Sequence, residues 1–193
     1  MSDAPSVSPR IAPLEPPFEA ELGALLAKMT PPGAPNVLAL FRTLAKNPKL
    51  AERMMATGGH FLGKGSSLAM RDREIVIDRV CARCGNEYEW GVHVAAFAKA
   101  AGLSDAEVRG TVHYPPDPDA WAPNEAALIA MVDALHETST IADAEWAELA
   151  LHYNEAQLVE LIMLTGWYHA ISFVCNALRV PLENWQARLP KAL

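Results

Sequence analysis

The sequence has no excess of basic residues and no basic run longer than two. Its 16 Lys and Arg residues stand against 23 Asp and Glu residues, which gives a formal net charge of -7. Binding to a phosphate backbone depends on clustered Lys and Arg side chains. The charge balance therefore argues against a nucleic-acid partner.

Export and membrane signals are also lacking. The N-terminal stretch MSDAPSVSPRIAPLEPP has neither the basic segment nor the apolar segment of a secretory signal. Three cysteines, an odd number, do not make a disulfide framework, so we expect a reducing, cytoplasmic location. The longest apolar stretch, LVELIMLTGWYHAISFVCNAL, is interrupted by Glu160, His169 and Asn176. We interpret it as a buried core helix, and we expect no membrane association.

Alternating strand patterns of useful length are absent as well. Five of the 15 prolines fall within the first 17 residues, so we predict an extended proline-rich arm over residues 1–17. The remainder, residues 18–193, suits one domain. Its apolar residues recur with a helical period, which predicts an all-α bundle of about eight helices. Predicted helix starts are marked by the capping residues Asn47, Ser104, Asn124, Asp143 and Asn154.

The stretch CARCGNEYEWGVH at residues 81–93 raises three alternatives: a redox dithiol, a metal site or neither. Cys81 and Cys84 share a helical face but fall at the C-terminal end of their helix, where the dipole favours the thiol over the thiolate. Two thiols packed in the core are the simplest interpretation. A zinc site needs two more ligands. His93 is the one nearby candidate, since Cys175 is isolated in the sequence.

Glu89 and His93 stand at i and i+4, so their side chains can meet on one helical face. A carboxylate beside an imidazole can fix its tautomer and raise its pKa, which suits acid–base catalysis. The alternative is an ordinary surface ion pair. The apolar and aromatic neighbours of the pair weigh against that alternative.

Two further acids lie on the preceding helix, which is apolar over a broad face. Glu74 falls in its first turns, where a carboxylate also complements the helix dipole. Asp78 interrupts the apolar run EIVIDRV at a position that we expect to be buried. Its simplest explanation is a salt bridge to Arg79 or Arg83, and a role in a pocket is the alternative.

The segment RDREIVIDRVCARCGNEYEWGVHVAAFAKAAGLSDAEV resembles the carboxymuconolactone decarboxylase family, whose superfamily includes alkylhydroperoxidase D. The resemblance extends over about residues 35–185 and includes QLVELIMLTGWYHAISFVCNALRVPLE. It implies an alkylhydroperoxidase D-like helical bundle. It also implies homo-oligomers, either trimers or hexamers, with a small-molecule substrate and with chemistry that needs neither a metal nor an organic cofactor.

The resemblance also bears on the dithiol. In the peroxidase branch a Glu precedes the first redox Cys by twelve positions, and a His follows the second by four. When Glu74 and His93 are aligned with those residues, Asn86 and Glu89 occupy the two redox positions. The cysteines at 81 and 84 lie one to two helical turns too early. The resemblance therefore implies that the dithiol is not a peroxidase centre.

What remains resembles the decarboxylase branch. We predict His93, Glu89 and Glu74 as catalytic residues, with Glu89 holding the imidazole and Glu74 completing a relay or binding the substrate. The substrate-binding candidates are Tyr88, Trp90 and His169, the last of which has a satisfied core histidine as its alternative. An anionic substrate needs a positive group, for which the candidates are Arg71, Arg73 and Arg79.

The predicted function is a cofactor-independent acid–base enzyme acting on a small carboxylated or lactone substrate. Two alternatives stay open. One is a thiol peroxidase or disulfide reductase that uses Cys81 and Cys84, and the other is a non-catalytic oligomeric binding protein.

Overall fold

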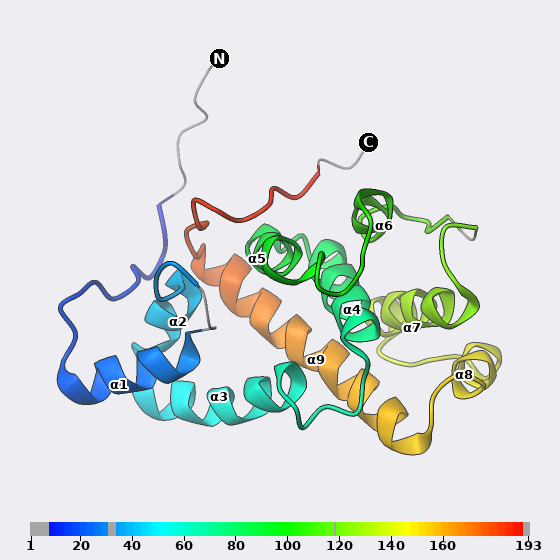
Figure 1. Cartoon of the computed structure of the whole chain (residues 1–193), viewed down its shortest axis with the longest axis horizontal. Helices are drawn as coiled ribbons and strands as arrows, with labels where there is room; N and C mark the ends of the chain where they lie inside the picture. Colours follow the sequence, from blue (N-terminus) through cyan, green and yellow to red (C-terminus); the bar gives the residue numbers. More distant parts are fainter. Residues whose placement is uncertain (1–7, 31–33, 118, 191–193) are drawn as a thin grey trace, which may run out of the picture. The chain divides into compact units, whose positions relative to one another are not determined.

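The computed structural model of the chain describes residues 8–30, 34–117 and 119–190. In these ranges the only regular structure is α-helix, and the helices follow one another as Figure 1 shows. They are α1 (Ala20–Met29), α2 (Ala39–Leu44), α3 (Pro48–Leu62), α4 (Met70–Arg83), α5 (Glu87–Phe97), α6 (Asp105–Gly110), α7 (Pro123–Thr138), α8 (Asp143–Ala150) and α9 (Glu155–Leu178). The predicted all-α class is confirmed, and the described ranges hold nine helices where about eight were expected.

The described residues form two compact units. The first contains residues up to 65 together with 173–184 and includes α1, α2 and α3. In this unit the backbone amide of Arg10 donates to the carbonyl of Leu178, and that of Leu14 donates to Arg42. Residues 8–17 of the predicted arm contain no helix or strand, and residues 1–7 lie outside the described residues.

The second unit contains residues 66–172 and 185–190 and is organised around α4. This helix packs against α5 and α7, and α7 packs against α8. All nine residues from Arg73 to Cys81 are buried. The expected burial of Asp78 on this helix is therefore confirmed. Because α4 is enclosed, its charged residues have little contact with water.

The C-terminal segment of the second unit covers α5. The amide of Ala187 donates to the carbonyl of Gly91 at 3.0 Å, and the side chain of Gln186 donates to the carbonyl of Glu87 at 2.9 Å. A Cβ atom at Gly91 would lie 2.2 Å from the Ala187 carbonyl oxygen. Glycine is therefore required for this close approach.

Three of the predicted helix caps are present. The side chain of Asn47 accepts from the amide of Leu50, Ser104 forms a capping box with Glu107, and Asn154 exchanges hydrogen bonds with Gln157. The predictions at Asn124 and Asp143 are wrong, because α7 and α8 are capped one or two residues earlier, at Ala122 and Ala142. In both cases a glutamate at the third helical position binds the cap amide instead.

The long helix α9 is the one helix in the described ranges with the length and hydropathy of a membrane span. Half of its most apolar window is buried inside the protein. A core helix of a helical domain passes the same test, so this is weak evidence for a membrane. Through residue 172, α9 belongs to the second unit, and its last residues belong to the first.

Candidate functional site

The turn between α4 and α5 brings their polar residues together. Gly85 adopts a left-handed backbone, with φ of 60°, which ends α4 at little steric cost. Asn86 then caps α5, and its side-chain oxygen accepts from the amide of Glu89. Its amide nitrogen donates to Ser172 Oγ on α9 at 3.0 Å. Asn86 thus links the start of α5 to α9.

A hydrogen-bonded chain of buried side chains crosses three helices of this unit. His93 Nδ1 on α5 lies 2.7 Å from Glu74 Oε2 on α4, and His93 Nε2 lies 3.0 Å from the Tyr168 hydroxyl on α9. Glu89 Oε2 is 3.6 Å from His93 Nε2. The exposed fractions of Glu74, His93 and Tyr168 are 0%, 3% and 3%. We refer to Glu74, Glu89, His93 and Tyr168 as the His93 cluster.

Glu74 and Glu89 contact His93 differently from what the sequence predicted. We expected Glu89, one turn away, to hold the imidazole. The short contact to the ring belongs instead to Glu74, at the opposite nitrogen. A carboxylate that accepts from Nδ1–H fixes the tautomer with its lone pair on Nε2. Nε2 is then the atom at which a proton can be gained or lost.

Burial and charge act in opposite directions on His93. Burial tends to lower the pKa of its imidazole, but the negative charge and hydrogen bond of Glu74, with further contributions from Glu89 and Asp78, raise that pKa above its ordinary value. Burial raises the pKa of Glu89, although the nearby imidazole opposes the shift. The Tyr168 hydroxyl has a strongly raised pKa, because of burial first and then the two glutamates, so it stays protonated.

Asp78 is one turn from Glu74 and is 1% exposed. The expected salt bridge to Arg79 or Arg83 is wrong: Arg79 pairs with Asp133 at 2.6 Å, and Arg83 pairs with residues of α7. Neither carboxyl oxygen of Asp78 has a hydrogen-bond partner among the described residues. Burial, followed by the charge of Glu74, raises the pKa of Asp78 well above its ordinary range despite the opposing effect of His93. The side chain is therefore held in its neutral form beside the cluster.

Of the three arginines considered for substrate binding, Arg73 lies at the cluster. Its guanidinium contacts Glu74 Oε1 at 3.0 Å and is almost fully buried. Arg71 binds Glu107 and Glu125, and Arg79 binds Asp133 and two backbone carbonyls. All three arginines are therefore paired with acidic side chains, and Arg73 is the one whose partner, Glu74, belongs to the cluster.

The two thiols of the CARC sequence lie at the end of α4, as expected. Cys81 is completely buried, and Cys84 is the C-cap residue. They form no disulfide. Burial raises the pKa of Cys84, and this effect exceeds the opposing effects of Ser172 and Arg83. A raised pKa disfavours the reactive thiolate that a redox dithiol requires.

The aromatic candidates have structural contacts. Trp90 Nε1 donates to Thr111 Oγ1 at 3.0 Å, and Tyr88 is 2% exposed. His169 Nδ1 lies 2.9 Å from the carbonyl oxygen of Thr165, and its Nε2 contacts His136 on α7. The aromatic hydroxyl at His93 belongs to Tyr168, which was not among the predicted site residues. The one sequence signal for Tyr168 was its polar group within an apolar helix.

Part of the chain matches a known protein family. Residues 48–134 match the model of the carboxymuconolactone decarboxylase family, a range that includes Glu74, Glu89 and His93 but not Tyr168. No curated protein matches the chain significantly. The fold is that of the AhpD-like helical proteins.

Solved structures share the fold along nearly the whole chain. A peroxidase-related protein from Silicibacter sp. TM1040 has 16% identity and a TM-score of 0.77, with 95% of this chain and 96% of that chain covered. An alkylhydroperoxidase AhpD core protein from Ralstonia eutropha JMP134 has 16% identity and a TM-score of 0.76, with coverage of 90% and 93%. The debrominase Bmp8, in complex with 2,3,4-tribromopyrrole, has 16% identity and a TM-score of 0.76, with coverage of 93% and 94%. The chain therefore contains a segment similar to the carboxymuconolactone decarboxylase family and shares the fold of AhpD-like proteins.

Proposed function

We propose that the protein is a cofactor-independent acid–base enzyme of the carboxymuconolactone decarboxylase type, acting on a small carboxylated or lactone substrate. The observation that carries the proposal is the buried chain from Glu74 through His93 to Tyr168. A histidine pinned by a carboxylate at one nitrogen is suited to proton transfer at the other.

The protein residues have separate roles in this proposal. His93 Nε2 donates or accepts the proton, and Glu74 fixes the tautomer through Nδ1. In the neutral state the Tyr168 hydroxyl donates to Nε2. After protonation, Nε2–H donates to the Tyr168 oxygen or toward Glu89. Glu89 is the second catalytic carboxylate in this proposal. Its Oε2 lies 3.6 Å from His93 Nε2, where its negative charge stabilises the imidazolium.

In a decarboxylation, the bond between the carboxylate carbon and its neighbouring carbon breaks, and its electron pair passes into the adjacent carbonyl or unsaturated lactone. The imidazolium of His93 then gives its proton to the carbon that lost carbon dioxide. Arg73 supplies the positive charge nearest the cluster for the substrate carboxylate. Because the cluster is buried, these charges act in a low dielectric, where a preorganised group stabilises developing charge most strongly.

The test uses a panel of carboxylated lactones and related unsaturated acids, with release of carbon dioxide and solvent deuterium at the product carbon as readouts. We expect His93→Gln to reduce kcat by about 10²–10⁴-fold, which is the range that general acid–base catalysis contributes. The matched control is His152→Gln, because His152 also pairs with a glutamate at i-4, but on the surface. Full turnover in folded His93→Gln protein would refute the proposal.

A further inference from the structure

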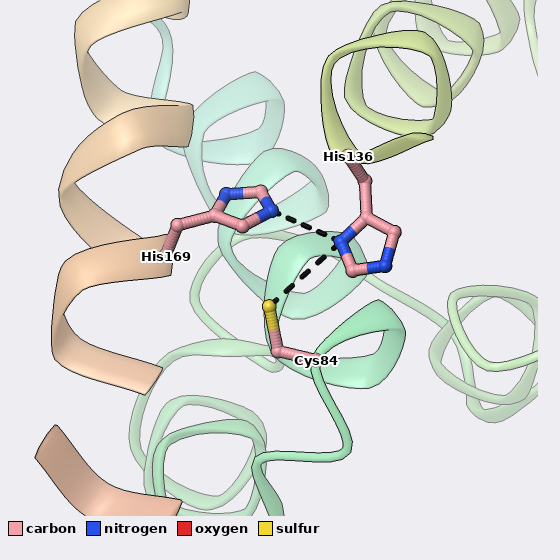
Figure 2. A group of neighbouring side chains, drawn as sticks. All are labelled: Cys84, His136 and His169. Carbon is pink, nitrogen blue, oxygen red and sulfur yellow. Dashed lines mark hydrogen bonds between the residues drawn. The ribbon is translucent and has the colours of Figure 1, made fainter. Parts of the chain in front are cut away.

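A second group of polar side chains in this unit shares no residue with the His93 cluster. It consists of Cys84 at the C-terminal end of α4, His136 in the last turn of α7 and His169 on α9 (Figure 2). His136 Nδ1 lies 3.0 Å from His169 Nε2 and 3.9 Å from Cys84 Sγ. All three donor atoms lie within 4.8 Å of one another. They converge from three helices on one point.

These distances suit a tetrahedral metal ion. Zinc bonds of about 2.0–2.1 Å to nitrogen and about 2.3 Å to sulfur place tetrahedral donor atoms about 3.3–3.6 Å apart. The observed separations of 3.0 Å and 3.9 Å lie on either side of that range. Side-chain shifts of less than about 1 Å would therefore form all three bonds at these lengths.

The surroundings also prepare the donors for a metal. The hydrogen bond from His169 Nδ1–H to the Thr165 carbonyl leaves the Nε2 lone pair directed at His136. Metal-binding histidines in proteins are commonly held by such a bond at the other nitrogen.

Arg83 is the cation nearest the group, and its charge is compensated. It contacts Glu137 at 2.6 Å and Asp133 at 3.4 Å, both on α7. Its guanidinium also stacks 3.7 Å from the centre of the Tyr114 ring. These contacts fix the position of the Arg83 side chain and balance its positive charge. The charge of Arg83 therefore opposes the binding of a divalent ion less.

We propose that Cys84, His136 and His169 bind a zinc(II) ion, with a fourth coordination position open to water or another small ligand. One thiolate and two imidazoles favour zinc over magnesium or calcium, which prefer oxygen donors. Binding converts the Cys84 thiol to a thiolate and releases one proton to solvent. The proton on His136 Nδ1 moves to its Nε2, which leaves the bonding lone pair free.

The experiment uses full-length protein stripped of metal by a chelator and titrated with zinc(II) by calorimetry. Cobalt(II) is then added as a spectroscopic probe. We expect one ion per chain, affinity that increases with pH, and a thiolate-to-cobalt charge-transfer band. Cys84→Ser should abolish that band. Loss of a residue that only supports a metal ligand weakens binding by about 10–100-fold. We expect a larger loss of zinc affinity in each of three variants, Cys84→Ser, His136→Gln and His169→Gln.

Cys81→Ser and His152→Gln are the matched controls and should bind as the wild type does. If Cys81→Ser also abolished binding, the ligands would be the two thiols, and the proposal would be wrong. If the folded wild-type protein showed no charge-transfer band with cobalt(II), His136 and His169 would be a hydrogen-bonded pair and not metal ligands together with Cys84. That result would also overturn the proposal. Because this readout needs no variant, the test does not depend on each variant folding.

Discussion

The contact between Glu74 and His93 makes a prediction that needs no substrate. Their atoms lie 2.7 Å apart in a buried environment. Opposite charges about 4 Å apart interact by about 4 kcal/mol at an effective dielectric of about 20, and a shorter separation strengthens the interaction. Replacing Glu74 with Gln keeps the shape but removes the charge, so burial then dominates. We expect the pKa of His93 to fall below its wild-type value.

The assay is a nitrogen-detected NMR titration of the histidine rings in wild type and Glu74→Gln. Glu89→Gln should cause a smaller decrease, since Glu89 is farther from the ring and its own pKa is raised. Glu148→Gln is the control, because Glu148 pairs only with the surface residue His152 in the interactions described. A His93 pKa that stays within about 0.3 units of wild type in Glu74→Gln would refute the electrostatic argument.

The same pair predicts how stability depends on pH. The pKa of His93 is raised in the folded state above its unfolded value of about 6.5. Its contribution to the free energy of unfolding is therefore fully present below that pH. It is lost as pH rises through the folded-state pKa. Chemical denaturation at pH values between about 5 and about 9 should show this loss in the wild type and not in Glu74→Gln, in which burial determines the pKa of His93.

Three further predictions concern other residues of the second unit. Cys81→Ser should leave kcat within about tenfold of wild type, a barrier change below about 1.4 kcal/mol, whereas a larger loss in folded protein would restore the redox alternative. Asp78→Asn should raise the free energy of unfolding at pH 7, because burial raises the pKa of the Asp78 carboxyl, so that folding must take up a proton there, whereas an amide needs none. That gain should shrink as pH falls toward the unfolded-state pKa of 3.8, and denaturation curves showing no gain would contradict it. Val159 and Met163 are 65% and 57% exposed on one face of α9. We expect light scattering to give a trimer or hexamer that Met163→Glu disrupts, and a wild-type monomer would be the contrary result.

Positions within one helix were accessible from the sequence. The apolar run around Asp78 predicted the enclosed helix α4, and Cys84 was expected at its C-terminal end. The spacing of Glu89 and His93 predicted that they share a face, because helical periodicity alone determines neighbours four residues apart. The wrongly predicted caps at Asn124 and Asp143 also have a local cause. Pro123 already occupies the first position of α7, and glutamates of the first turn bind the cap amides of both helices.

Contacts between helices were decided by the tertiary structure. Glu74 is 19 residues from His93, and Tyr168 is 75 residues away, so no periodicity relates them. The same is true of Cys84, His136 and His169, which are contributed by three helices. The sequence could name a histidine and its acidic neighbours, but the angle and register at which α4, α5, α7 and α9 pack determine which nitrogen meets which partner. That choice depends on the fit of whole helix surfaces, because side chains interdigitate across each interface rather than along one chain.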